Sequence, residues 1–140
     1  MLALVLAGCF SPVAPDIGPI AHAPCSNADS DPAHAVSFSA DLAGGVFTEY
    51  HCAHCHTPTG VTPIGLEVSG LDLESYATLM AGARGTAVVV PGEPCSSLLV
   101  QKVGDAPPRG GRMPLDGPPF LEDDDIQLLS DWIAEGANDD

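Results

Sequence analysis

Cys52-Ala53-His54-Cys55-His56 is a C-x-x-C-H sequence, the pattern at which c-type haem is attached covalently to protein. Two thiols at this spacing have the reach to form both thioether links on one edge of a porphyrin. The histidine that follows then lies beneath the iron, and imidazole is a common axial ligand of haem iron. The motif therefore predicts one covalently attached haem held by Cys52, Cys55 and His56. A C-x-x-C pair also occurs in thiol redox sites and in zinc sites, and both alternatives remain open.

Length and composition predict one domain plus a tail in this chain of 140 residues. Hydrophobic residues make up 45% of the chain, but aromatic residues only 5%. A small domain with so few rings has little apolar surface to bury, and small domains are hard to stabilise by burial alone. A buried haem would supply the missing apolar volume.

The charge is strongly acidic, with 19 acidic residues against four basic ones and a net charge of −15. The four basic residues are Arg84, Lys102, Arg109 and Arg112. Nucleic acid and anionic lipid headgroups are poor partners for such a chain, because both bind basic patches. Acidity favours a redox partner protein with a basic docking surface. The alternative is that it serves solubility alone.

The first nine residues end in Leu6-Ala7-Gly8-Cys9, which resembles a bacterial lipobox with Cys9 as the lipidated residue. We expect a short or truncated lipoprotein signal at 1–9, and the alternative is a nonfunctional hydrophobic N-terminus. Two acyl chains on Cys9 would anchor the protein to a membrane, since no stretch approaches the ~20 apolar residues of a spanning helix. The expected location is the periplasmic side of the bacterial cell envelope. Phe10, rather than aspartate, follows Cys9, which favours the outer membrane.

Residues 10–35 contain five prolines, at positions 12, 15, 19, 24 and 32, with Ser, Asp and Ala between them. Such a stretch cannot bury enough surface to fold alone, so it is interpreted as a flexible tether. His22 and His34 are expected to be exposed tail residues rather than metal ligands.

From residue 36 to residue 140 the apolar spacing predicts a small all-α domain of three to four helices. Ser37-Phe38-Ser39 is the expected start of the first helix, with a serine as its N-cap beside an apolar residue, and the helix leads into Cys52 and stops by Pro58. Gly44 and Gly45 in this helix mark either the close approach of another helix or a late helix start. Further helices are expected at 71–83, from Ser96 to Val100, and at 122–135, where Trp132 faces inward. The acidic run at 122–125 suits the positive end of the last helix dipole.

This order of elements, with Val90-Pro91-Gly92-Glu93-Pro94, Arg112-Met113-Pro114 and Trp132-Ile133 after the C-x-x-C-H motif, resembles class I c-type cytochromes. The chain is most similar to the short cytochrome c domains of planctomycete and myxobacterial envelope proteins, over residues 36–140. The resemblance places Gly44 where the superfamily has its helix-crossing glycine. Thr48 stands where an aromatic residue is usual, with Phe47 beside it, so the helix contact is in doubt.

The resemblance also implies that Met113 is the second axial ligand of the iron. Its loop is stiffened by Pro114 and preceded by two glycines, so a thioether there can close over the distal face. Met80 is the competitor, but it lies on a helical apolar stripe and is interpreted as core. His51 and His54 are tied to the attachment turn and cannot easily reach the far face. For Arg112, a haem propionate contact and an exposed loop position remain open.

Cys25 and Cys95 remain after Cys9 is assigned to lipid and the motif cysteines to haem. An even pair in an oxidising compartment predicts a disulfide, and two free thiols are the alternative. The expected function is a monohaem cytochrome that carries single electrons between envelope redox partners, not an enzyme. Two rivals are a haem peroxidase or small-gas sensor with a labile Met113, and a structural haem module of a larger envelope complex.

Overall fold

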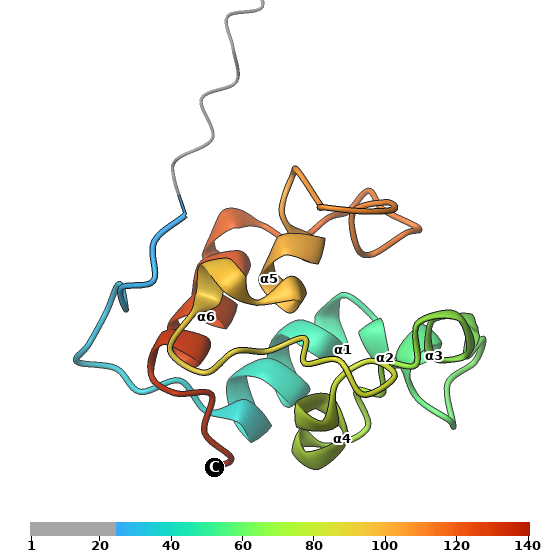
Figure 1. Ribbon diagram of the computed structural model, residues 1–140, viewed down its shortest axis with the longest axis horizontal. Coiled ribbons are helices and arrows are strands. Elements are labelled where there is room, and N and C mark those ends of the chain that lie inside the picture. Colours follow the sequence, from blue (N-terminus) through green and yellow to red (C-terminus); the bar gives the residue numbers. More distant parts are fainter. Residues whose placement is uncertain (1–24) are drawn as a thin grey trace, which may run out of the picture.

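The computed structural model describes residues 25–140, and these residues fold into helices and loops (Figure 1). In chain order the elements are η1 (Phe38–Val46), α1 (Phe47–Glu49), α2 (Cys52–His56), α3 (Ile64–Ser69), α4 (Tyr76–Ala81), η2 (Pro94–Ser96), α5 (Leu98–Val103) and α6 (Asp123–Ala134). No β-strand occurs in this part of the chain, so the all-α expectation is confirmed. The expected number of three to four helices was too low. The signal at Cys9 and His22 lie outside the described residues.

The first helix begins where the sequence predicted, because the Ser37 side chain accepts a hydrogen bond from the Ala40 amide at 3.1 Å. It starts as the π-helix η1 and continues directly into the short α1. Gly44 does not mark a helix crossing here. A Cβ placed on Gly44 would lie 3.1 Å from the Ser39 carbonyl oxygen of the same helix, and no described atom from another part of the chain would lie within 4 Å of it. The glycine therefore relieves crowding inside a wide helical turn.

The helix expected at 71–83 is shorter than its apolar spacing suggested. Ser75 and Thr78 form a reciprocal capping box, so α4 begins only at Tyr76 and ends before Gly82. The preceding residues remain in a loop because Leu73 donates its amide to the His56 carbonyl at 2.7 Å. α3 was not predicted at all, since none of its residues is buried and no apolar stripe marks it.

The last helix, α6, was predicted to within a residue at each end. One aspartate of its acidic first turn, Asp125, has a specific partner as well as the helix dipole. It accepts a hydrogen bond from the Tyr50 hydroxyl at 2.6 Å, and the Glu122 amide donates to that hydroxyl at 3.1 Å. Tyr50 thus joins the segment just before Cys52 to the start of α6.

The core is centred on Trp132, which is fully buried. Phe38 packs against it with ring centroids 5.6 Å apart, and Tyr76 meets both rings. Phe47 contacts Phe38 edge-on at 6.4 Å, while Thr48 is exposed. Phe47 therefore supplies the aromatic contact of this helix, from the position next to the one where the resemblance expected it.

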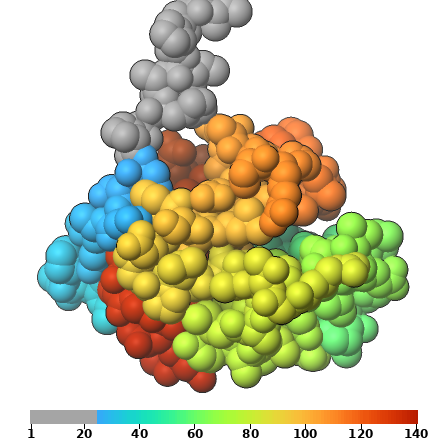
Figure 2. Space-filling model, in the orientation of Figure 1, coloured from blue at the N-terminus to red at the C-terminus, as the bar shows by residue number. Residues whose placement is uncertain are grey.

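Residues 25–36 form a strap that lies against the helical domain, and Figure 2 shows this blue segment touching the gold and red parts of the surface. Cys25 and Cys95 are joined by a disulfide bond. Ser30 donates both its amide, at 2.8 Å, and its hydroxyl, at 2.6 Å, to the carboxylate of Asp131 on α6. The Cys95 amide donates to the Asn27 side chain at 2.9 Å. The strap is therefore held both by the covalent bond and by polar contacts. His34 is exposed.

No helix within residues 25–140 combines the length and the apolar character needed to cross a bilayer.

Candidate functional site

The short helix α2 brings the two motif cysteines and His56 together within a turn and a half. His51 adopts a left-handed backbone conformation, with φ 54°, and this turns the chain sharply from α1 into α2. Histidine is among the non-glycine residues that tolerate this region best. Cys52 and Cys55 are free thiols that are each partly accessible, and His56 is buried at the end of the helix. The His51 and His54 rings lie edge to face on the exposed side.

The His56 ring is oriented by the loop that follows α3. Its Nδ1 lies 3.3 Å from the Leu71 carbonyl oxygen, which can only accept a hydrogen bond. Nδ1 therefore carries the proton, and the lone pair of Nε2 is left for a metal. Burial lowers the pKa of His56, and the Leu71 bond opposes that shift. Such a contact fixes the orientation of a metal-ligating histidine and raises its basicity.

Gly65 on α3 lets that helix approach His56 closely. A Cβ at this position would lie 2.8 Å from the imidazole Nε2 and 2.8 Å from the Cys55 carbonyl oxygen. Both distances are too short for a side chain, so only glycine fits. Sequence reasoning missed Gly65 and Leu71, because neither belongs to a motif and α3 has no buried face. The only sequence signal for these two residues was that they follow His56 closely in the chain.

Cys52 packs against the hydrophobic core, whereas Ala53 and His54 of the same helix are exposed. Burial raises the pKa of the Cys52 thiol to about 11, and the nearby Cys55 and Asp116 groups add to that shift. Asp116 belongs to the loop that follows Met113. This loop lies next to the start of α2, because Pro114 and Asp116 line the same hollow as His51.

A hollow of about 230 Å³ lies between these two segments. It is lined on one side by Glu49, Tyr50 and His51 and on the other by Pro114, Asp116 and Pro119. Met113 is partly buried against the core beside it, and the Met113 amide donates to the Lys102 carbonyl at 2.7 Å. Met80 also packs against the core, on α4. The structure thus brings the Met113 loop against the residues that precede the attachment helix.

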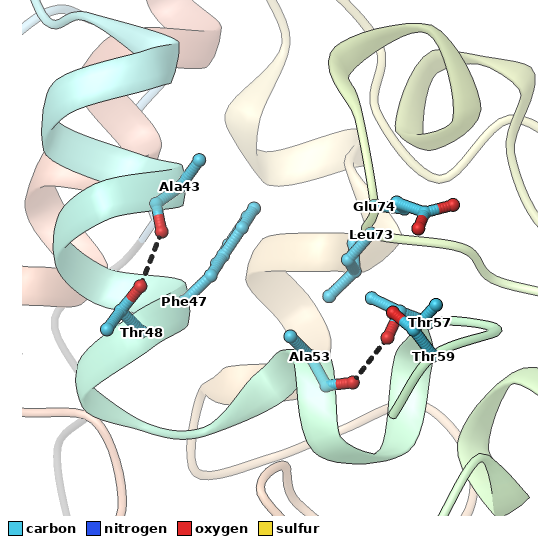
Figure 3. Close-up of a pocket in the computed structure, with 8 residues that line it drawn as sticks. All are labelled: Ala43, Phe47, Thr48, Ala53, Thr57, Thr59, Leu73 and Glu74. Atoms are coloured by element: carbon cyan, nitrogen blue, oxygen red, sulfur yellow. Dashed lines mark hydrogen bonds between the residues drawn. The ribbon is translucent and has the colours of Figure 1, made fainter. Parts of the chain in front are cut away.

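A second hollow of about 280 Å³ separates the first helix from α2 (Figure 3). Phe47 and Ala43 face it from one side, and Ala53 and Thr57 from the other. The hydroxyls of Thr48 and Thr57 are satisfied by carbonyl oxygens of their own helices, at 2.8 Å each. The two hollows thus flank α2, and the described residues that line them do not include Cys52, Cys55, His56 or Met113.

Arg112 is not an exposed loop side chain. Its guanidinium donates to the Val103 carbonyl at 2.7 Å and to the Leu121 carbonyl at 3.1 Å, and it forms an ion pair with Asp105. The exposed-loop alternative of the sequence analysis was therefore wrong.

The residues present fit a covalently attached haem. Two free thiols and an oriented imidazole share one helix, and apolar side chains of the core lie behind them. Within residues 25–140, no three His, Cys, Asp or Glu side chains are grouped so as to hold a metal ion by themselves.

Residues 52–117 match the family model described as Planctomycete cytochrome C, a match that begins at Cys52 and includes Cys55, His56 and Met113. The match supports the resemblance to planctomycete cytochrome c domains over these residues. The match supports binding of haem c by this part of the chain, and it is consistent with electron transfer. No curated protein and no solved structure matches the chain.

Proposed function

We propose that this chain, whose residues 52–117 match the planctomycete cytochrome c model, is a monohaem carrier of single electrons. Cys52 and Cys55 would form the thioether bonds, and His56 and Met113 would be the axial ligands. The observation that carries the proposal is the orientation of His56, whose Nδ1 is bound to the Leu71 carbonyl at 3.3 Å. This leaves Nε2 as the ligand atom on the helix that holds both thiols.

The proposed ligand set favours electron transfer over enzymatic chemistry. Iron held by both His56 and Met113 would have no open position for peroxide or a small gas, and methionine in place of a second histidine would raise the reduction potential. When bound, the haem supplies the one-electron couple. The chain's own contribution is to fix the imidazole through Leu71, to hold the Met113 loop near α2, and to exclude water with the core around Trp132.

We further propose that the protein works at the bacterial cell envelope, anchored through Cys9, and docks basic redox partners. With a net charge of −15, long-range attraction would speed encounter with a basic partner and weaken with salt. Docking would be weak, as transient redox encounters are. The anchor is tested by Cys9→Ser, which should move the protein from the membrane fraction to the soluble fraction. Retention of the variant in the membrane would contradict lipidation.

The axial ligands are tested by visible spectra of the oxidised protein with haem attached. The wild-type protein should show a weak band near ~695 nm, typical of methionine bound to ferric haem, and Met113→Ala should abolish it. Met80→Leu is the matched control, because Met80 packs on the core of the same domain. A band that survives Met113→Ala but is lost in Met80→Leu would reassign the ligand. A high-spin spectrum in the wild-type protein would favour the peroxidase or gas-sensor alternative instead.

A further inference from the structure

Three of the four basic residues of this acidic chain lie between positions 102 and 112, around the C-terminal end of α5. The Lys102 ammonium donates to the carbonyl of Arg109, at 2.9 Å, and to that of Gly111. Arg112 is turned inward. The Lys102 side chain is therefore directed at the backbone of the loop that leads to Met113, and the Arg112 side chain at the segments on either side of that loop.

Arg112 joins two separate segments by its own side chain, the end of α5 with Asp105 and the residues just before α6. Nε donates to the carbonyl of Val103, the last residue of α5, at 2.7 Å. One terminal nitrogen bonds Asp105, and the other donates to the carbonyl of Leu121 at 3.1 Å. The guanidinium carbon also lies 4.7 Å from the centre of the Phe120 ring. The two ends of the Met113 loop are thus fastened to one planar group.

Met113 is held to the same place by its backbone. Its amide donates to the Lys102 carbonyl at 2.7 Å, one residue before the Val103 carbonyl that Arg112 engages. Opening the loop far enough to withdraw Met113 would break this amide bond. It would also pull Arg112 away from Leu121 or from the end of α5.

We propose that Arg112 is a positioning residue that keeps the Met113 loop closed and so sets how readily Met113 leaves the iron. The proposal rests on the proposed function, in which Met113 is the second axial ligand. The guanidinium suits the task because its rigid fork reaches three acceptors at once, a geometry that a lysine ammonium cannot reproduce. The positive charge also opposes the negative end of α5.

The experiment measures replacement of Met113 by imidazole in the oxidised, haem-loaded protein. At saturating imidazole the replacement rate is limited by departure of methionine, so it reports opening of the loop. Arg112→Gln should raise this limiting rate at least about tenfold, the change expected from loss of one net hydrogen bond to a charged group. Arg112→Lys retains the charge and should show a smaller increase. Amide hydrogen exchange at Met113 should accelerate in the same order.

The control variant is Ser30→Ala, which removes the 2.6 Å bond from the strap to Asp131 and leaves the Met113 loop unchanged. It should lower the stability to urea without changing the imidazole rate. If Arg112 had only a structural role, Arg112→Gln would behave like Ser30→Ala, with a lower stability to urea and an unchanged imidazole replacement rate. That result would overturn the proposal.

Failure of the inference and failure of the proposed ligand can be distinguished. An Arg112→Gln rate within about twofold of the wild-type rate, with the ~695 nm band still dependent on Met113, would refute the role of Arg112 alone. Loss of that dependence would refute ligation by Met113. In that case, unchanged amide exchange at Met113 in Arg112→Gln would refute the closed-loop role as well, and accelerated exchange would support it.

Discussion

Removal of the Cys25–Cys95 disulfide should cost a large share of the stability of the folded domain. The double variant Cys25→Ser/Cys95→Ser breaks the covalent closure of a loop whose ends are 70 residues apart in sequence. That loop includes α2, α3 and α4. Without the bridge, the unfolded chain gains conformational entropy, and the folded protein does not, so the free energy of unfolding falls.

The magnitude follows from the length of the loop. On the chain-entropy model, closing a loop of 70 residues lowers the free energy of the folded state relative to the unfolded state by about 4 kcal/mol. A domain of this kind has a total stability of roughly 5–15 kcal/mol. The hydrogen bonds from Ser30 to Asp131 and from Cys95 to Asn27 would remain possible, but without the disulfide they would hold the strap only weakly.

The assay is urea denaturation followed by far-UV circular dichroism, on the wild-type protein and the double variant. The midpoint should fall by an amount equivalent to about 4 kcal/mol, while the slope of the transition stays similar. Treating the wild-type protein with a reductant is the matched control. Thioether bonds resist reduction, so the Cys25–Cys95 bridge is the covalent link that would open, and the urea titrations are compared with the haem iron in the same oxidation state. A loss of stability below about 1 kcal/mol would refute the reasoning that the Cys25–Cys95 bridge restricts the unfolded chain.

Two further substitutions test the surroundings of the attachment helix. Gly65→Ala should destabilise the protein by about 1–3 kcal/mol in urea denaturation, because the added methyl group would meet the His56 ring and backbone at 2.8 Å. Gly45→Ala, where the nearest atom is at 3.6 Å, should be tolerated, and equal losses would contradict the packing argument. The bond to Asp125 raises the pKa of Tyr50, so Asp125→Asn should lower that pKa in a ¹³C-tyrosine NMR titration. Because the pKa is higher in the folded state, the stability from this bond is present below pH 10 and lost as the pH rises through the folded pKa. An unchanged Tyr50 titration in Asp125→Asn would contradict the assignment.

The parts of the fold that sequence reasoning predicted are those with strong local signals. The serine-capped helix start within residues 37–39, the position of α6 and the burial of Trp132 follow from capping chemistry and from apolar spacing. The same reasoning overestimated the helix that became α4. Its apolar spacing extends back to Leu71, but a hydrogen bond from Leu73 to the His56 carbonyl holds that stretch as a loop. Tertiary contacts of this kind leave no local pattern.

The candidate site shows the same division. Cys52, Cys55 and His56 could be identified as candidates from the sequence because covalent haem attachment requires the C-x-x-C-H spacing. The groups that orient them are not, since a backbone carbonyl such as that of Leu71 can come from any residue type. For Arg112, the residue type did not indicate the partners found in the structure. Its residue type suggested a charged ligand or solvent, whereas its actual partners are two carbonyls and an aspartate.

If the chain is anchored through Cys9 as proposed, the strap would also shorten the distance over which the domain can search for a partner. Were the strap free, its twelve residues, 25–36, would add up to about 40 Å of contour length between the domain and the anchor. Fixed along the surface by Cys25 and Ser30, they add none of this reach. Reduction of the Cys25–Cys95 disulfide would release the covalent hold on the strap and so lengthen the connection between the domain and its anchor. The oxidation state of its surroundings would then set how large a volume the domain explores.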